Sequence, residues 1–336
     1  MDNMNDKLAD GMNKRNRDTN KVLLSFVIPL FNEEESIDQL IGEIEAFSSN
    51  SKRPYEIVFV NDGSSDKTLD KVIAAQAKRE SIFLVNLSRN FGKEHALCAG
   101  LDYAKGGVVV IMDGDLQHPI ALVEEMLEYW SEGYDTVYTS RVNREEEGLV
   151  KRLLTRCFYK IFNGITDIKI APNASDFRLM DRVVVDALSS LRENNRFTKG
   201  LYSWVGFKAK EIPYIPNERL HGTTTWSLKN LWTFGLNGVF GFSSIPLRIT
   251  SLLGVLFSLF GFIYGINIII NVLIYGKDVP GYASIIATIV FFGGVQLLSL
   301  GVIGEYIARI FDESKQRPLY IVEGCYKNGS RADTKS

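Results

Sequence analysis

VVVIMDGDLQHP, residues 108–119, is the stretch that decides the fold. Its five apolar residues lead into Asp113-Gly114-Asp115, a pattern typical of a buried strand that ends at a polar turn. Two carboxylates on such a turn can point at one spot, which makes a hard oxygen site suited to Mg²⁺ or Mn²⁺. Taken alone, Asp-Gly-Asp is more often a plain turn. An EF-hand is excluded because Gln117 and His118 stand where that loop needs a ligand and a glycine.

The same alternation of apolar and polar segments continues on both sides of this stretch. From residue 22 to 138, short apolar runs alternate with segments of helical period, which predicts a parallel sheet covered by helices. Strands are expected at 23–28, 55–60, 82–87, 108–112 and 136–139, and helices at 34–47, 66–79, 93–104 and 120–130. Ligands bind such sheets beyond the carboxyl ends of the strands. The polar residues 32–33, 61–66 and 113–117, which follow three of the strands, are therefore the candidate site.

Composition limits the class of protein. The chain has 336 residues, room for about two domains, and its 38 basic against 40 acidic residues do not indicate a nucleic-acid binder. Residues 249–276 and 279–304 are uncharged and are separated by Lys277 and Asp278. Each run is long enough to cross a hydrocarbon core of about 30 Å. The sequence thus predicts two transmembrane helices and excludes a fully soluble protein.

The rest of the chain offers weaker signals. The chain has only three cysteines, far apart in the sequence, which excludes a disulfide framework and a Cys-pair zinc site and indicates a reducing compartment. Its three histidines are equally scattered, so an imidazole-bound metal is not favoured. Residues 1–21 are expected to be disordered, and no cleavage site follows that would favour a signal peptide. Residues 149–165 have the pattern of an interfacial helix or of a core helix, and the nearby membrane anchor favours the former.

Seven segments carry a family resemblance and together extend from about residue 23 to 318: FVIPLFNEEESI, EIVFVNDGSSDKTLD, LSRNFGKEHAL, MDGDLQHP, SDFRLMDR, NRFTKGLYSWVGF and GVQLLSLGVIGEYIARIFDESKQRP. They resemble glycosyltransferase family 2, and within it the polyprenyl-phosphate glycosyltransferases such as dolichyl-phosphate mannose synthase and the bactoprenol glucosyltransferases. The resemblance implies an α/β GT-A (Rossmann-like) fold with interfacial amphipathic helices and two C-terminal transmembrane helices. It also implies inverting transfer of one sugar from a UDP-sugar, with N-acetylglucosamine or glucose as the sugar, to undecaprenyl phosphate.

The domain boundaries expected on this basis divide the chain into five parts. They are a disordered extension (1–21), a GT-A catalytic domain (22–225), juxtamembrane amphipathic helices (226–248), a transmembrane hairpin (249–311) and a cytoplasmic tail (312–336). Basic residues flank the hairpin on the side of the catalytic domain, which places that domain in the cytoplasm of a multi-pass inner-membrane protein. The resemblance further implies a homo-oligomer, namely a tetramer, and the product suggests a flippase and a downstream glycosyltransferase as partners.

Site residues follow from the resemblance and from local chemistry. The resemblance implies a divalent metal, Mg²⁺ or Mn²⁺, on Asp113, Asp115 and Gln117. It places the nucleotide on Pro29, Phe31, Glu33 and Asp62, together with Asp113. Arg89 and Lys93 stand at a predicted helix start, a place where a bound phosphate is favoured, and they are expected to bind the nucleotide. The alternative is that both side chains are simply solvated at the start of the helix. The catalytic residues expected are Asp115, Asp176 and Arg141.

The acceptor phosphate is expected on four arginines, because a guanidinium is a good phosphate clamp. They are Arg141, Arg152, Arg156 and Arg178. For Arg152 and Arg156, attraction to anionic lipid headgroups is an equal alternative.

Two departures from the family pattern define the rival hypotheses. First, Asn61 stands where many family members have the first aspartate of Asp-Asp-Gly-Ser, while the second carboxylate, Asp62, is retained. Second, Thr225 stands where the family commonly has a lysine near the phosphates. The missing lysine is the only feature that favours a catalytically inert nucleotide-sugar sensor or scaffold. A processive polysaccharide synthase is disfavoured because the chain has no Gln-x-x-Arg-Trp segment and two spans are few for a polymer channel.

Overall fold

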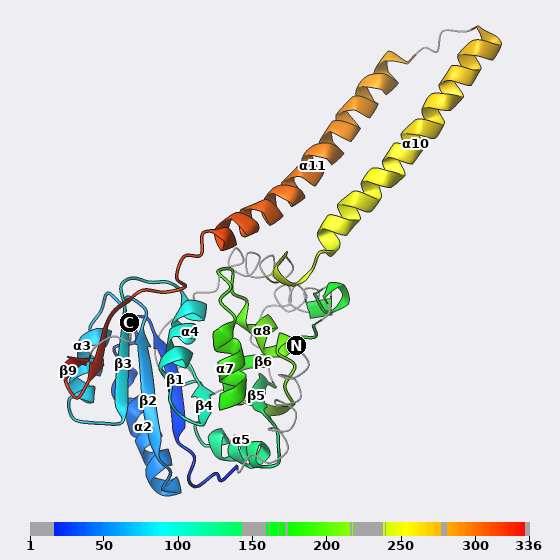
Figure 1. The fold of residues 1–336 in the computed structure, drawn as a ribbon. Coiled ribbons are helices and arrows are strands. Elements are labelled where there is room, and N and C mark those ends of the chain that lie inside the picture. Colours follow the sequence, from blue (N-terminus) through cyan, green and yellow to red (C-terminus); the bar gives the residue numbers. More distant parts are fainter. Residues whose placement is uncertain are drawn as a thin grey trace, which may run out of the picture. The chain divides into compact units, whose positions relative to one another are not determined.

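The computed structural model describes residues 17–142, 159–160, 162–166, 168–171, 174–215, 217, 238, 240–276 and 281–332. The chain divides into two units (Figure 1). The first comprises residues 1–160, 168–227 and 318–336, and the second comprises residues 161–167 and 228–317. The interfacial helix expected at 149–165 lies mostly outside the described residues, as do Arg152, Arg156, Thr225 and most of the segments 1–21 and 226–248.

The stretch from residue 108 forms the centre of the sheet, as its apolar run predicts. Strand β4 (Val108–Ile111) is buried along its whole length and pairs in parallel with β1 (Leu24–Leu30). The parallel ladder continues through β2 (Tyr55–Asn61) and β3 (Ile82–Leu87), which lie side by side in Figure 1. Because these bounds closely match the predicted strands, the parallel core of the α/β fold is confirmed.

The sheet beyond β4 differs from the prediction. The described strands form one nine-stranded sheet of order β7-β5-β6-β4-β1-β2-β3-β8-β9. Strand β6 (Ala174–Asp181) runs antiparallel between β4 and β5 (Thr136–Arg141), and β7 (Ala209–Tyr214) follows beside β5. A purely parallel sheet that ends at residue 139 is therefore wrong. The prediction missed β6 because Asp176 and Arg178 interrupt its apolar run, the signal on which strand assignment rests.

Helices cover both faces of the sheet. On one face, α2 (Ile37–Ser51), α3 (Thr68–Gln76) and α5 (Leu122–Ser131) pack on a cluster that includes Phe26 and Phe59. On the other lie α4 (Lys93–Tyr103) and α7 (Arg182–Ser190), both in view in Figure 1, and α8 (Thr198–Trp204) follows α7. This two-sided burial explains why β1, β2 and β4 are almost continuously apolar.

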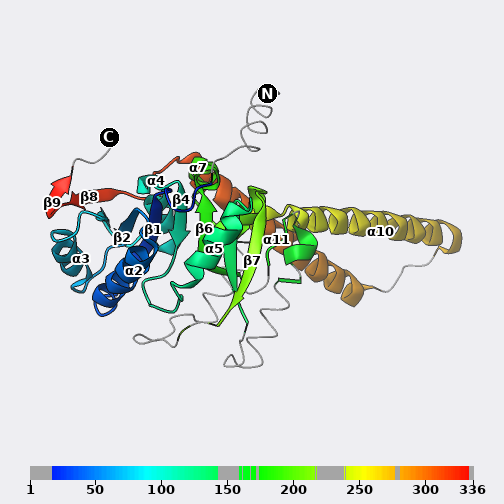
Figure 2. The ribbon, with the colours of Figure 1, turned by 90° about the horizontal axis from the view of Figure 1, so that it is seen from below.

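The segment after the hairpin returns to the sheet. Strand β8 (Val322–Lys327) pairs antiparallel with β3, and β9 (Ser330–Ala332) extends the edge. Figure 2 shows β8 and β9 in red at this end of the sheet. The last described residues of the segment expected as a tail, 312–336, are thus part of the first unit.

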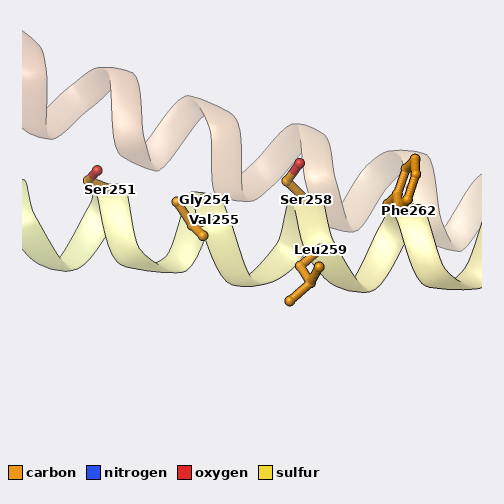
Figure 3. Close-up of a pocket in the computed structure, with 6 residues that line it drawn as sticks. All are labelled: Ser251, Gly254, Val255, Ser258, Leu259 and Phe262. Carbon is orange, nitrogen blue, oxygen red and sulfur yellow. The ribbon is translucent and has the colours of Figure 1, made fainter.

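The second unit is built on two long helices, α10 (Ile245–Tyr275) and α11 (Tyr282–Ser314). Both are long and apolar enough to cross a membrane, in agreement with the two uncharged runs. Within α11, Arg309 donates to Glu305, four residues earlier, at 2.8 Å. A groove of about 560 Å³ runs along α10 and is lined by both small and large side chains (Figure 3). Its lining residues are Ser251, Gly254, Val255, Ser258, Leu259 and Phe262.

Candidate active site

Three loops meet at the carboxyl ends of β1, β2 and β4, as the polar strand ends predict. The backbone of Gly63, after β2, has a φ of +66°, and a Cβ there would lie 2.5 Å from the carbonyl carbon of Arg89. Gly114, after β4, is packed against β1, because a Cβ would lie 2.7 Å from a methyl group of Leu30. Gly63 requires glycine, since a side chain there would push the backbone of the neighbouring loop away, whereas at Gly114 the side chain of Leu30 would have to move. The candidate site is therefore assembled by close backbone approach.

The loop after β1 is tied to the loop after β2. The Asn32 amide donates to Ser64 Oγ at 3.0 Å, and the Ser65 amide donates to Asn32 Oδ1 at 2.8 Å. Phe31, between Pro29 and these contacts, is 47% exposed, so its ring is free to stack on a planar ligand. Glu33 stands in the same loop, where its amide donates to Thr68 Oγ1. Of the residues predicted to hold a nucleotide, Phe31, Glu33 and Asp62 thus lie on two joined loops.

Asp62 has a structural task in addition to the predicted one. Its carboxylate is buried and accepts from the amides of Phe91 at 2.7 Å and Gly92 at 2.9 Å. Burial raises the pKa of this carboxyl above its ordinary value, against the lowering effect of the two amides. Asp62 therefore fixes the loop that leads into α4. In that loop the Arg89 guanidinium lies 4.1 Å from the centre of the Phe91 ring.

Lys93, at the first position of α4, joins two carboxylates from different strands. Its ammonium lies 2.6 Å from Asp113 Oδ1 and 2.8 Å from Asp176 Oδ2. Burial alone would lower the pKa of Lys93, but the two negative charges raise it well above its ordinary value. Burial would likewise raise the pKa of each carboxyl, yet Lys93 holds both values below the ordinary one. All three groups are consequently charged at neutral pH.

The turn after β4 presents oxygen atoms in a fixed arrangement. The Gln117 amide donates to Asp115 Oδ1 at 3.2 Å, and Leu116 between them adopts a φ of +60°, unusual for a residue with a side chain. Arg141, the last residue of β5, donates to Gln117 Oε1 at 3.3 Å. The structure thereby brings Arg141 to the predicted metal ligands.

The donor set of this turn fits a divalent cation that shares its ligands with a phosphate. Two carboxylates and one amide oxygen are hard ligands. In the part of the chain that the structure describes, no three His, Cys, Asp or Glu side chains form a complete metal cage. Mg²⁺ in nucleotide sites is typically held by one or two carboxylates and completed by water and substrate phosphates. The arrangement therefore matches a cation that binds together with its nucleotide.

A buried histidine supports the turn, which sequence reasoning missed. His118 is 1% exposed, stacks on Phe177 at 4.8 Å, and accepts at Nδ1 from the Asp113 amide at 3.2 Å. Its Nε2 lies 3.4 Å from Ser175 Oγ. Burial lowers the pKa of His118, so the ring is neutral and can accept at Nδ1. Only the spacing of His118 from Asp113 could have indicated this support, since the stacking partner comes from the unpredicted strand β6.

Arg178 lies deeper than its predicted role requires. Asp176 and Arg178 stand two residues apart on β6 and so share a face of the sheet. Arg178 is 3% exposed, its guanidinium lies 3.4 Å from the centre of the Tyr202 ring, and it donates to the Ser175 carbonyl. Burial lowers the pKa of Arg178, although the group stays charged at neutral pH. Contact of Arg178 with an acceptor phosphate stays a prediction.

A mixed sheet with an oxygen-rich turn after its central strand, together with two apolar helices, is the GT-A fold of a glycosyltransferase with a membrane hairpin. The Glycosyl transferase family 2 profile matches residues 25–189, and the GtrB C-terminal hairpin profile matches residues 245–310. The chain belongs to glycosyltransferase family 2. With the hairpin profile on both apolar helices, the protein is membrane-associated.

Relatives extend over most of the chain. It is 48% identical over 299 residues to the uncharacterized glycosyltransferase sll0501 of Synechocystis, covering 89% of this chain and 94% of the relative. It is 42% identical over 300 residues to the bactoprenol glucosyl transferase of Shigella phage SfV, covering 89% and 98%. Among solved structures, glucosyl-3-phosphoglycerate synthase of Mycobacterium tuberculosis with Mn²⁺ and UDP is similar at 19% identity and a TM-score of 0.43, covering 64% of this chain and 76% of that one.

Proposed function

We propose that this protein transfers a single sugar, N-acetylglucosamine or glucose, from a UDP-sugar to undecaprenyl phosphate. The observation that carries the proposal is the meeting of Lys93, Asp176 and Arg141 around the Asp113–Gln117 turn. Opposite charges from three strands and a helix start gather at one sheet edge, where a sugar diphosphate needs both cations and oxygen ligands. The similarity to bactoprenol glucosyl transferases over nearly the whole chain supports a polyprenyl phosphate as the acceptor.

This reaction requires the enzyme to position the acceptor phosphate and to compensate the negative charge of the departing diphosphate. A phosphate monoester has a second pKa near 6 and is mostly dianionic at neutral pH, so it needs no general base. We infer attack from the face opposite the diphosphate, with inversion. A Mg²⁺ or Mn²⁺ ion on Asp113, Asp115 and Gln117 supplies charge for the departing diphosphate when it is bound. Lys93 and Arg141 would add fixed positive charge beside it, and Asp176 would face the sugar.

The nucleotide would bind on the joined loops after β1 and β2. Phe31 offers a ring for stacking, and a uracil N3–H needs an acceptor such as Asp62. Since each Asp62 oxygen already accepts one amide, this contact would use a second lone pair. The acceptor phosphate would approach from the membrane side, guided by Arg141 and by the basic residues 152 and 156.

In the cell we propose a multi-pass protein of the cytoplasmic membrane with a cytoplasmic catalytic domain. Its product would pass to a flippase and a downstream glycosyltransferase, and the enzyme itself would be a homo-oligomer. The lipid-linked sugar would serve the modification of cell-wall or surface glycans.

The test is turnover by the purified full-length protein in detergent. Undecaprenyl phosphate would be incubated with labelled UDP-N-acetylglucosamine, UDP-glucose and GDP-mannose, with Mn²⁺ or with EDTA, and the lipid product separated. We expect one UDP-sugar to be transferred and EDTA to abolish the product. Preferential use of GDP-mannose would refute the donor assignment. No transfer from any of these donors, despite UDP binding, would favour the inert sensor.

A further inference from the structure

Strand β8 touches the candidate site from the far end of the chain. It pairs with β3 in a register that sets Gly324 opposite Asn86 and Val322 opposite Leu87. One residue further, the Ser88 amide donates to the Ile321 carbonyl at 3.0 Å. Residues 321–327 therefore line β3 as far as the loop that Asp62 holds in place. The hydrogen bond between Ser88 and Ile321 thus connects the segment that leads into β8 to the start of this loop.

A line of side-chain amides continues from β8 into the sheet. Glu323 Oε2 accepts from Asn86 Nδ2 at 2.9 Å, and Asn86 Oδ1 accepts from Asn61 Nδ2 at 2.7 Å. Asn61 Oδ1 then accepts from the Ser64 amide at 3.3 Å. Asn61 and Asn86 are 2% and 3% exposed in strands that are otherwise apolar. Buried amides in this setting need partners, so their orientation has consequences for every group in the line.

The line has a direction that Glu323 sets. An asparagine side chain donates through its nitrogen and accepts through its oxygen, whereas a carboxylate only accepts. Glu323 therefore requires Asn86 to present its nitrogen to β8 and its oxygen to β2. Asn61 must in turn present its oxygen to Ser64. Water in place of Glu323 could either donate or accept, and would leave both amides free to flip.

The end of the line is the proposed nucleotide pocket. Ser64 receives the Asn32 amide through its hydroxyl, and Asn32 follows Phe31 directly. Asp62 lies between Asn61 and the Gly63 turn. A flip of Asn61 would remove the acceptor of the Ser64 amide and loosen the contacts that join the two loops.

We propose that Glu323, on the strand after the membrane hairpin, is a positioning residue for the nucleotide pocket and acts through Asn86 and Asn61. The inference rests on the proposed nucleotide site for its effect on binding. Its effect on the loop at 62–66 does not depend on any ligand.

Two substitutions of the exposed Glu323 separate its hydrogen bond from its charge. Glu323→Gln keeps an acceptor oxygen, and Glu323→Leu has a similar volume and none. Lys327→Gln, at the exposed end of the same strand, is the matched control for a change of charge. The full-length proteins in detergent would be compared by hydrogen exchange of the peptide that covers 62–66, by the Kd for UDP with Mn²⁺, and by KM and kcat.

We expect Glu323→Leu to speed exchange at 62–66 and to raise the Kd for UDP and the KM for the UDP-sugar about tenfold, the effect of losing a hydrogen bond or two. Its kcat should stay within about twofold, because the metal turn and Lys93 lie outside this line. Glu323→Gln and Lys327→Gln should behave like the wild type.

Three outcomes have distinct meanings. Unchanged hydrogen exchange at 62–66 in Glu323→Leu would overturn the action of Glu323 through Asn86 and Asn61, whatever the Kd for UDP. Faster exchange with an unchanged Kd for UDP would overturn its role in positioning the nucleotide. Failure of the wild type to bind UDP at all would instead refute the proposed function. The exchange data would still test whether Glu323 acts on the loop at 62–66. A double-mutant cycle with Asn86→Leu should give a non-additive change in exchange at 62–66, and additivity would contradict the coupling of the two residues.

Discussion

Removal of the Lys93 charge should make the folded protein less stable as pH rises from 5 to 7.5, a range in which Asp113 and Asp176 give the wild type no such dependence. In the wild type, Lys93 holds the pKa values of Asp113 and Asp176 below the ordinary carboxyl value. Their contribution to stability is complete above about pH 4 and is lost only as pH falls below that value. Between pH 5 and pH 8 these two groups therefore add no slope to the stability of the metal-free protein.

In Lys93→Met the two carboxylates face each other without a cation. Both oxygens contact the same nitrogen at 2.6 and 2.8 Å, so they are at most 5.4 Å apart. At an effective dielectric constant of about 20, charges at this distance repel by roughly 3 kcal/mol, enough to raise one carboxyl pKa by about two units. Because the Lys93 side chain is 41% exposed, solvent screens part of this effect. We expect a loss of about 1–2 kcal/mol at pH 7.5.

The sign of the pH effect follows from the raised pKa. A carboxyl whose folded-state pKa is raised above its unfolded value contributes its stability in full below that unfolded value, about pH 4, and loses it as pH rises through the raised pKa. The Tm of Lys93→Met in EDTA should thus lie a few degrees below that of the wild type at pH 7.5 and approach it at pH 5.

Thermal unfolding in detergent at four pH values would measure this, with Lys21→Met as control. The Lys21 side chain is exposed and pairs with Asp18 at 3.6 Å, so this variant should change little. A Tm difference that is the same at pH 5 and pH 7.5 would refute the reasoning. Mn²⁺ should raise the Tm of Lys93→Met more than that of the wild type, because the ion would supply the missing positive charge.

Four further predictions address other parts of the chain. Asp115→Asn should fold and enter the membrane but transfer almost no sugar, as the wild type should with chelator; full activity of this variant in excess EDTA would contradict the metal assignment. Gly63→Ala should lower the Tm by several degrees and weaken UDP binding, since its φ is +66° and its Cβ meets backbone, whereas Gly42→Ala, with open space, should not. A cysteine at position 278 should react only from the periplasmic side, and labelling from the cytoplasm alone would invert the topology. Thr225→Lys should tighten binding of all UDP-sugars if the added charge acts on the diphosphate, and a changed ratio between two donors would instead show that this position selects the sugar.

The parallel core could be predicted from the sequence because burial on both faces leaves uninterrupted apolar runs. Strand β4 is the clearest case, since Val108–Ile111 ends directly at the carboxylate turn. The meeting of the strand-end loops followed from the same pattern, because parallel strands end at one edge. The residues of those loops were therefore predictable as a group.

The rest depended on contacts between distant segments, which periodicity does not reveal. Strand β6 carries charges that bind Lys93 and Tyr202 across the fold, so its sequence lacks the pattern of a buried strand. Strand β8 follows a hairpin of apolar helices and reads as a polar tail, because only Gly324 and Cys325 of its six residues are buried. His118 was missed for a similar reason, since its partner Phe177 belongs to β6.

The return of β8 to the sheet imposes an order on biosynthesis. The ribosome completes the parallel core before it makes the hairpin, and the strand that pairs with β3 is made only after both apolar helices. Until then β3 presents an unpaired edge, the kind of surface on which nascent chains aggregate. The sheet can therefore close at this edge only after both apolar helices have been synthesised.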